Sequence, residues 1–282
     1  MSNGADAAIL DADAARSATD TRRAAIRAAG TGFSIGRMLA VTRKELRSYF
    51  AFPLVYVLSG VFLVLAGYYA YTDLVFFVTI AFAHDIMQNY WSLLFTDIRL
   101  CLLLTLPFIT MRLFAEERKL GTIELLYTYP LRDGEVLGGK YLASVAIFFM
   151  MLVLTMLYPI FLYTVHSFPL FPLAAAYLGL FLMGCAFIAC GVFISSLCES
   201  QVMAGMGTIV LLLLFWILNW NEAAFGNSYL ELLRAFSLFD QFGPFAKGVI
   251  NLANVTYFIF FITFFLFLTQ RSMEARKWTG RR

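Results

Sequence analysis

Hydrophobic positions along the chain gather into long uncharged runs that short polar segments separate. A helix needs about 20 apolar residues to cross the roughly 30 Å hydrocarbon layer of a membrane. By this measure the sequence predicts six spans, which lie within residues 48–72, 84–112, 141–165, 170–198, 201–220 and 248–269. Pro53 begins the first span, and residues 166–172 form an external turn. We therefore expect an all-α integral membrane protein whose six transmembrane helices form one domain, residues 51–270.

A helical pattern precedes the first span in residues 33–50. One predicted face is apolar, and it carries Ile35, Leu39, Thr42, Leu46 and Tyr49. Another face is basic, and it carries Arg37, Arg43, Lys44 and Arg47. This pattern predicts an interfacial amphipathic helix on the inner membrane surface, with its bases toward anionic lipid headgroups. The helix serves either as a simple anchor or as a contact for a partner subunit.

Two further segments lie outside the predicted spans. Residues 1–32 are rich in Ala, Asp and Arg and contain no apolar stretch, which predicts a mobile tail that is not a signal peptide. Residues 221–248 mix leucines and phenylalanines with charged side chains and contain Gly243 and Pro244. This mixture predicts short external amphipathic helices before span six, and a folded external cap is the alternative.

Composition agrees with a membrane protein. Hydrophobic residues make up 61% of the chain and charged residues 14%, whereas soluble domains are about 45 to 50% apolar. The net charge is only +3, but 18 of the 21 Lys and Arg residues fall within residues 1–47, 112–140 and 271–282. An even number of spans places these segments on one side, and the positive-inside rule makes that side the cytoplasm. We expect cytoplasmic termini, including a basic C-terminal tail at 271–282, and no nucleic-acid binding.

The segment 112–140 is the most highly charged interruption between two predicted spans. Nine charged side chains occur among the 25 residues from Glu116 to Lys140. Gly121 allows a sharp break after span two, Thr122 can cap a short helix, and Pro130 ends it. The pattern predicts a compact cytoplasmic helix that docks a partner protein, and a solvated loop is the alternative.

Span two contains two charges. Its uncharged core, residues 100–111, has 12 residues and covers only about 18 Å. The helix must therefore extend through Asp97 and Arg99. We expect both to lie at the outer interface and to snorkel, with a milder effect of replacing Arg99 than of replacing Asp97. Alternatively they face a protein-lined cavity, where each needs its own partner because positions two apart diverge on a helix.

Catalytic patterns are weak in this sequence. The four cysteines lie in or beside spans without metal-ligand spacing, and the two histidines are far apart, so we expect neither a metal site nor an active site. Residues 134–140 match a phosphate-binding GxxxxGK pattern, but no strand precedes them and we expect no nucleotide there. The middle of every span except the second lacks charge, which favours an external energy source over ion coupling. A secondary transporter or channel is the alternative.

The residues also carry a resemblance to a known family. The stretch at 111–126, MRLFAEERKLGTIELL, is followed by Pro130, Asp133 and the LGGK at 137–140. Together with RKELRSYF at 43–50, it resembles the cytoplasmic loop of ABC-2 type permeases, most of all the gliding-motility type. Nitrous-oxide-reductase maturation permeases have a related loop. The resemblance covers roughly residues 35–270.

The resemblance implies a permease subunit in a bacterial inner membrane that pairs with itself or with a related permease. A separate ABC ATPase subunit would bind ATP and Mg²⁺, so this chain would hold no cofactor and would not itself be an enzyme. Glu116, Glu117, Gly121, Thr122 and Glu124 match the coupling helix region. The implied function is ATP-driven export. A second implied function is a scaffold that transmits motion to an external auxiliary protein without moving a solute.

Overall fold

The computed structural model describes residues 34–79, 86–119, 121, 132–165, 168–220 and 237–279, and every element in these residues is a helix. The helices are α2 (Ile35–Ala51), α3 (Pro53–Thr79), α4 (Ile86–Thr110), α5 (Arg112–Lys119), α7 (Asp133–Thr155), α8 (Leu157–Val165), α9 (Leu170–Leu197), α10 (Gln201–Trp220), α12 (Leu238–Ala246) and α13 (Leu252–Thr279). The predicted all-α class is confirmed. The predictions for the tail at 1–32 and for residues 122–131 and 221–236 lie outside the described residues.

Five stretches are long and apolar enough to cross a membrane. They are Pro53–Phe77, Tyr90–Lys119, Asp133–Thr164, Leu170–Leu197 and Leu252–Ala275. The remaining candidate, α10, occupies the predicted place of span five, but its described apolar stretch, Gln201–Ile217, is shorter than the others. The chain is thus a multi-pass membrane protein, and the count of six spans stays a prediction.

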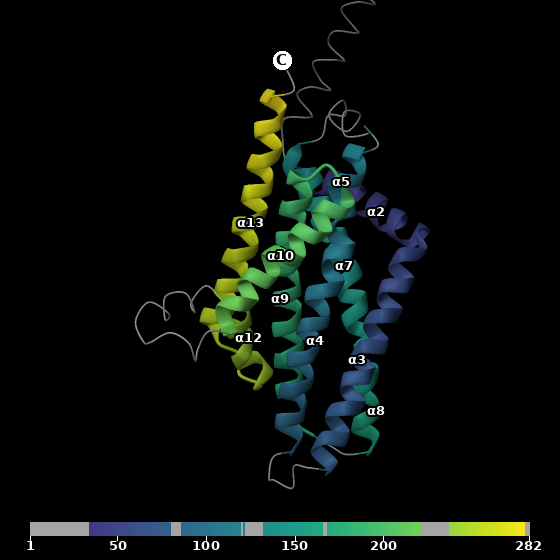
Figure 1. Ribbon diagram of the computed structural model, residues 1–282, viewed down its shortest axis with the longest axis vertical. Coiled ribbons are helices and arrows are strands. Elements are labelled where there is room, and N and C mark those ends of the chain that lie inside the picture. The colour runs from purple at the N-terminus through teal and green to yellow at the C-terminus, as the bar shows by residue number, and fades with distance from the viewer. Residues whose placement is uncertain are drawn as a thin grey trace, which may run out of the picture.

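Helix α9 lies at the centre of the bundle (Figure 1). It contacts α4, α7, α10, α12 and α13, and 72% of its most apolar stretch is buried, compared with 28% for α3 and for α13. Its glycines allow this close packing. A Cβ atom at Gly184 would overlap Phe148 of α7, and one at Gly191 would overlap Thr110 of α4. Small residues at helix contacts are typical of membrane proteins, where van der Waals packing holds helices together.

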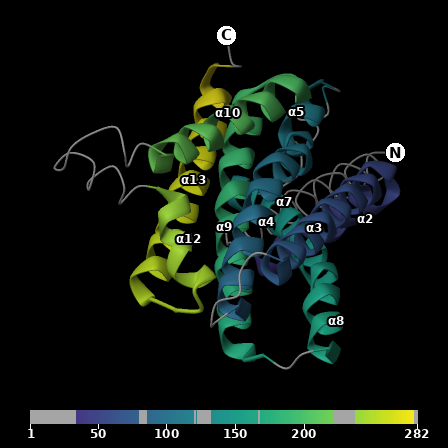
Figure 2. The same ribbon diagram turned by 60° about the horizontal axis from the view of Figure 1, so that its bottom comes forward.

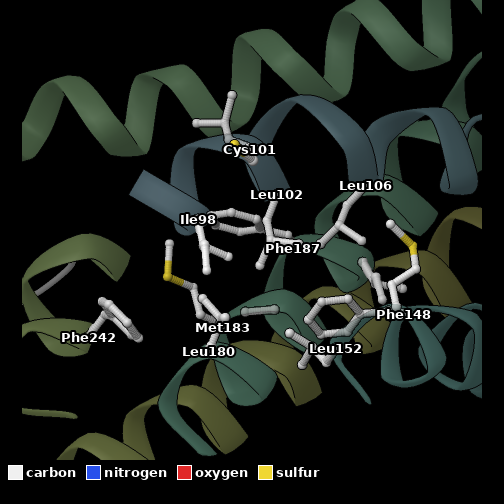
Figure 3. Close-up of a cluster of buried hydrophobic side chains, with 14 of the residues drawn as sticks. Ile98, Cys101, Leu102, Leu106, Phe148, Leu152, Leu180, Met183, Phe187 and Phe242 are labelled. Atoms are coloured by element: carbon white, nitrogen blue, oxygen red, sulfur yellow. The ribbon is translucent and has the colours of Figure 1, made fainter. Parts of the chain in front are cut away.

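The side chains of four helices meet in the core (Figure 3). Figure 3 labels Ile98, Cys101, Leu102 and Leu106 of α4, Phe148 and Leu152 of α7, Leu180, Met183 and Phe187 of α9, and Phe242 of α12. All ten are less than 5% exposed. The presence of Phe242 shows that α12, the described part of the predicted external segment, packs into the bundle.

The two ends of the bundle differ in charge. Helices α2 and α5 and the C-terminal end of α13 lie at one end, and α8 reaches the other (Figures 1 and 2). We call the first the basic end, because α2, α5 and the last turns of α13 together carry most of the Lys and Arg residues of the described helices. Helix α13 continues to Thr279, so the predicted tail at 271–282 begins inside a helix.

Helix α2 lies where residues 33–50 predicted a helix, and the face that it turns to the bundle differs from the predicted apolar face. The placement of that apolar face against the membrane surface stays a prediction. Ile35 and Leu39 are 64% and 54% exposed, whereas Val41, Glu45 and Tyr49 are buried. The reason is that α2 packs along α7. The hydroxyl of Tyr49 also donates a hydrogen bond to the Ile109 carbonyl of α4 at 3.0 Å, so α2 contacts the bundle through a partly polar face.

Candidate functional site

A buried lysine joins three helices at the basic end. Lys140 of α7 is 1% exposed, and its ammonium donates three hydrogen bonds. The acceptors are the Leu113 carbonyl of α5 at 2.7 Å, the Glu117 carboxylate of α5 at 2.8 Å and the Glu45 carboxylate of α2 at 3.2 Å. An ammonium has three protons, so the hydrogen-bonding capacity of Lys140 is filled.

Lys44 adds a second cation from the solvent side. Its ammonium lies 3.3 Å from Glu45 and 3.6 Å from Glu117, and the side chain is largely exposed. Burial lowers the pKa of Lys44, but the two carboxylates outweigh that effect and raise its pKa above the ordinary value. We call Glu45, Glu117, Lys140 and Lys44 the ion network. It holds two carboxylates and two ammonium groups, so its formal charge is balanced.

A second ionic contact joins the first turns of α2 and α7. The buried carboxylate of Glu135 pairs with Arg37 at 3.2 Å. It also accepts hydrogen bonds from the backbone N–H groups of Ser34 at 2.8 Å and Arg132 at 3.1 Å. The N–H groups at the start of a helix have no partner within the helix and need acceptors. Here one carboxylate accepts from the residue before α2 and from the residue before α7.

The GxxxxGK pattern at 134–140 has a structural explanation. These residues form the first two turns of α7 and not a loop. A Cβ at Gly138 would meet Met38, and one at Gly139 would lie 2.7 Å from Val41. Both glycines therefore allow α2 to pack closely against α7. Lys140 then points into the ion network.

Helix α5 is a feature that the sequence analysis did not predict. It follows α4 after a break at Met111, and its first turn is capped by Ser195 of α9. The Ser195 hydroxyl accepts hydrogen bonds from the N–H groups of Phe114 at 3.1 Å and Ala115 at 3.3 Å, and it donates to the Met111 carbonyl at 3.3 Å. A cap normally lies next to its helix in sequence. No local signal predicts one that comes from 80 residues away.

The other end of α5 is also fixed. The Arg118 guanidinium donates to the Cys198 carbonyl, just after α9, at 3.1 Å. Gly121 has a φ of +67°, and its N–H donates to the Arg118 carbonyl at 3.0 Å. This left-handed conformation favours glycine and ends the helix, as expected from the sequence. Helix α5 is therefore held at its start, middle and end.

The structure separates the predicted coupling residues. Glu116 pairs with Arg112 on its own helix at 2.8 Å, and Glu117 belongs to the ion network. The buried ammonium of Lys140 already holds the Glu117 carboxylate. A coupling role for Glu116 and Glu117 stays a prediction. The predicted helix between Gly121 and Pro130, including Thr122 and Glu124, lies outside the described residues.

Asp97 and Arg99 diverge, as their spacing predicts. Arg99 lies about 20 Å along the helix axis from the start of α4 at Ile86. Its guanidinium donates to the Phe239 carbonyl of α12 at 3.2 Å. Its charge also lies 5.3 Å from the ring centre of Phe239 and 5.9 Å from that of Phe242. The half-buried Asp97 instead lies within electrostatic range of Asp73 on α3. The cavity interpretation fits Arg99 better than snorkelling does, because its partners come from another helix of the bundle.

No metal site is apparent in the part of the chain that the structure describes. There, no group of three or more His, Cys, Asp or Glu side chains is arranged to hold an ion. All four cysteines are free, and Cys101, Cys185 and Cys190 are buried among the helices. The described contacts at the basic end are ion pairs and hydrogen bonds that connect α2, α5 and α7.

The comparisons with known proteins fit this geometry. The model of a family described as "ABC-2 family transporter protein" matches residues 39–265, a segment that begins in α2, ends in α13 and includes the whole ion network. A search of curated proteins gave no match. The resemblance to ABC-2 type permeases is confirmed, while the gliding-motility subtype stays a prediction. The chain belongs to the ABC-2 family of transporter proteins.

Proposed function

We propose that this chain is the permease subunit of an ATP-driven exporter in a bacterial inner membrane. Two permease chains pair, and a separate ABC ATPase binds ATP and Mg²⁺ and docks at the basic end. The positive-inside rule places that end in the cytoplasm, where an ATPase has access to nucleotide. Membership of the ABC-2 family supports this proposal.

The observation that carries the coupling mechanism is the fixation of α5. The chain continues directly from α4 into α5, the ion network connects α5 to α2 and α7, and Ser195 connects it to α9. Residues 120–131 follow α5 and lead into α7. A force applied there would act on α5, which is connected to α2, α4, α7 and α9. Packed helices respond to such a force by moving as rigid bodies. Helices α4 and α7 would carry the motion across the membrane.

The docking surface we propose is the segment 120–131 together with the exposed end of α5. Glu116 and Glu117 are paired within this chain, so Glu124 is the acidic residue we assign to the ATPase contact. Lys119, which is exposed at the end of α5, lies next to this surface in sequence. Charges at the rim of an interface change association rates and partner choice more than they change fold stability.

The test uses the full chain, reconstituted in nanodiscs with a candidate ABC ATPase subunit. Glu124→Lys should weaken ATPase association by about tenfold, which corresponds to about 1.4 kcal/mol of binding free energy, and should lower ATP hydrolysis at limiting ATPase. Glu274→Lys is the matched control, because it makes the same charge change on the exposed end of α13. We expect it to leave association unchanged.

Two results would contradict the proposal. If no ATPase associates with the unchanged chain, the permease assignment fails. If Glu124→Lys and Glu274→Lys have the same small effect, the segment 120–131 is not the docking surface. Both variants should elute like the unchanged chain on size exclusion, which shows that a loss of association does not come from unfolding.

A further inference from the structure

A cavity of about 710 Å³ lies between α4 and α12. Its polar lining includes Ser92, Thr96 and Arg99 of α4, Asp240 of α12, and Lys247 and Asn251 just after α12. The volume is within the range of about 300 to 1,000 Å³ that is usual for sites of small organic molecules.

The polar side chains on α4 form one stripe. Ser92, Thr96 and Arg99 are spaced by four and three residues, so they lie on the same face of the helix. A polar stripe on a membrane-spanning helix is costly unless protein, water or a ligand faces it. The hydroxyl of Thr96 donates to the Ser92 carbonyl of its own helix at 2.7 Å, and its oxygen can still accept a hydrogen bond.

Arg99 gives this stripe its chemistry. A guanidinium has five N–H groups. Among the described residues, Arg99 makes one hydrogen bond, to the Phe239 carbonyl, and the rings of Phe239 and Phe242 lie beside its charge. The remaining N–H groups have no protein acceptor at hydrogen-bond distance in the described residues, although Arg99 lines the cavity. Such a group is suited to binding a carboxylate or a phosphate, which accept two parallel hydrogen bonds.

The remaining lining specifies the rest of the ligand. Among the described lining residues, Arg99 and Lys247 are cationic and Asp240 is anionic. Apolar lining comes from Phe239, Phe242 and other residues of α12. An anionic head and an apolar tail would both find matching surfaces.

We propose that this cavity binds one anionic amphiphile of the membrane. Its phosphate or carboxylate head is held by Arg99, and its acyl chain lies along Phe239 and Phe242. This site is distinct from the ion network at the basic end, and binding at it does not depend on an ATPase. Its test can therefore succeed or fail independently of the proposed function.

The experiment measures binding to the full chain, purified in an uncharged detergent. Phosphatidylglycerol is titrated, and binding is followed by native mass spectrometry and by the thermal unfolding midpoint. Phosphatidylcholine, which has no net charge, and inorganic phosphate, which has no acyl chain, are the two comparison ligands. We expect phosphatidylglycerol to bind at least tenfold more tightly than either and to raise the unfolding midpoint.

Two variants test the cavity separately. Arg99→Gln removes the positive charge, and Thr96→Phe fills the space while keeping Arg99, so a folding defect in one leaves the other informative. Both should weaken phosphatidylglycerol binding at least tenfold. Arg271→Gln is the matched control, because this arginine is 64% exposed on α13 and pairs with Glu274 outside the cavity. It should bind like the unchanged chain.

Three outcomes would overturn the proposal. Equal binding by all variants would show that the lipid adsorbs to the surface. Equal binding of phosphatidylcholine would show that the anionic head is not recognised. Equal binding of inorganic phosphate would make this a free-anion site without a role for the acyl chain.

Discussion

Lys140 and Arg99 are both cations within the helix bundle, but their surroundings differ. Lys140 is 1% exposed, and three acceptors from α2 and α5 use all of its ammonium protons. Within the described part of the chain, Arg99 makes one hydrogen bond, lies beside two phenylalanine rings and lines a cavity. A cation with filled hydrogen-bonding capacity can only join helices. A cation with N–H groups that still lack an acceptor can also bind a ligand, so burial of a charge alone does not reveal its role.

The largest expected effect is at Lys140. Replacing it with Met leaves Glu45 and Glu117 without their buried partner, and breaking a buried ion pair costs about 3 to 5 kcal/mol of the free energy of unfolding. Arg99→Gln should cost about 1 kcal/mol, because an amide can still donate to the Phe239 carbonyl. Denaturation of both variants in mixed micelles measures the difference. Equal losses would remove the distinction between the two cations.

A smaller effect is expected where α2 approaches α7. In Gly139→Ala the new Cβ would lie 2.7 Å from Val41, and such overpacking costs about 1 to 3 kcal/mol. Gly134→Ala is the control, since nothing lies within 4 Å of its Cβ and alanine favours a helix. We expect unfolding at lower denaturant for the first variant only. If the two variants unfold alike, the ion network does not need the close approach of α2.

The cap on α5 should contribute less than the ion network. Ser195→Ala leaves the N–H groups of Phe114 and Ala115 without their acceptor, which costs about 1 to 2 kcal/mol. Ser196→Ala is the neighbouring control, because this equally buried hydroxyl bonds only the Phe193 carbonyl of its own helix. Faster amide hydrogen exchange in α5 should accompany the first substitution alone. Unchanged exchange would mean that the ion network suffices to hold α5.

The smallest effect concerns Lys44, the exposed member of the ion network. Because its pKa is raised, Lys44 stabilises the fold fully below its unfolded pKa of about 10.4, and the contribution is lost as pH rises through the higher folded value. Lys44→Met should change the free energy of unfolding by less than about 1 kcal/mol, as is usual for exposed pairs. The difference from the unchanged chain should be constant from about pH 7 to 9. A strong dependence in that range would contradict the assignment.

The sequence predicted the long helices because a membrane imposes a simple rule of length and hydrophobicity. The boundaries of α9 and α10 differ from the predicted ones by at most one residue, and Pro53 begins α3 as expected. The glycine break at Gly121 was also readable, since a positive φ favours this residue. Charged helix ends were placed less accurately. Helix α7 begins at Asp133, eight residues before the predicted span, because Glu135 and Lys140 find partners on α2 and α5.

The sequence alone determined the class of the protein, most of its helices and its resemblance to ABC-2 permeases, because these depend on local composition and on a continuous motif. Tertiary structure decided the roles of individual polar residues. Glu117 has a structural role because it pairs with Lys140, which lies 23 positions further along the chain. Helix α5 begins where it does because Ser195 of α9 caps it. Arg99 faces α12, and its partner Phe239 is 140 residues away in sequence. A charge or a hydroxyl acts according to the partner it meets, and the packing of distant helices selects that partner.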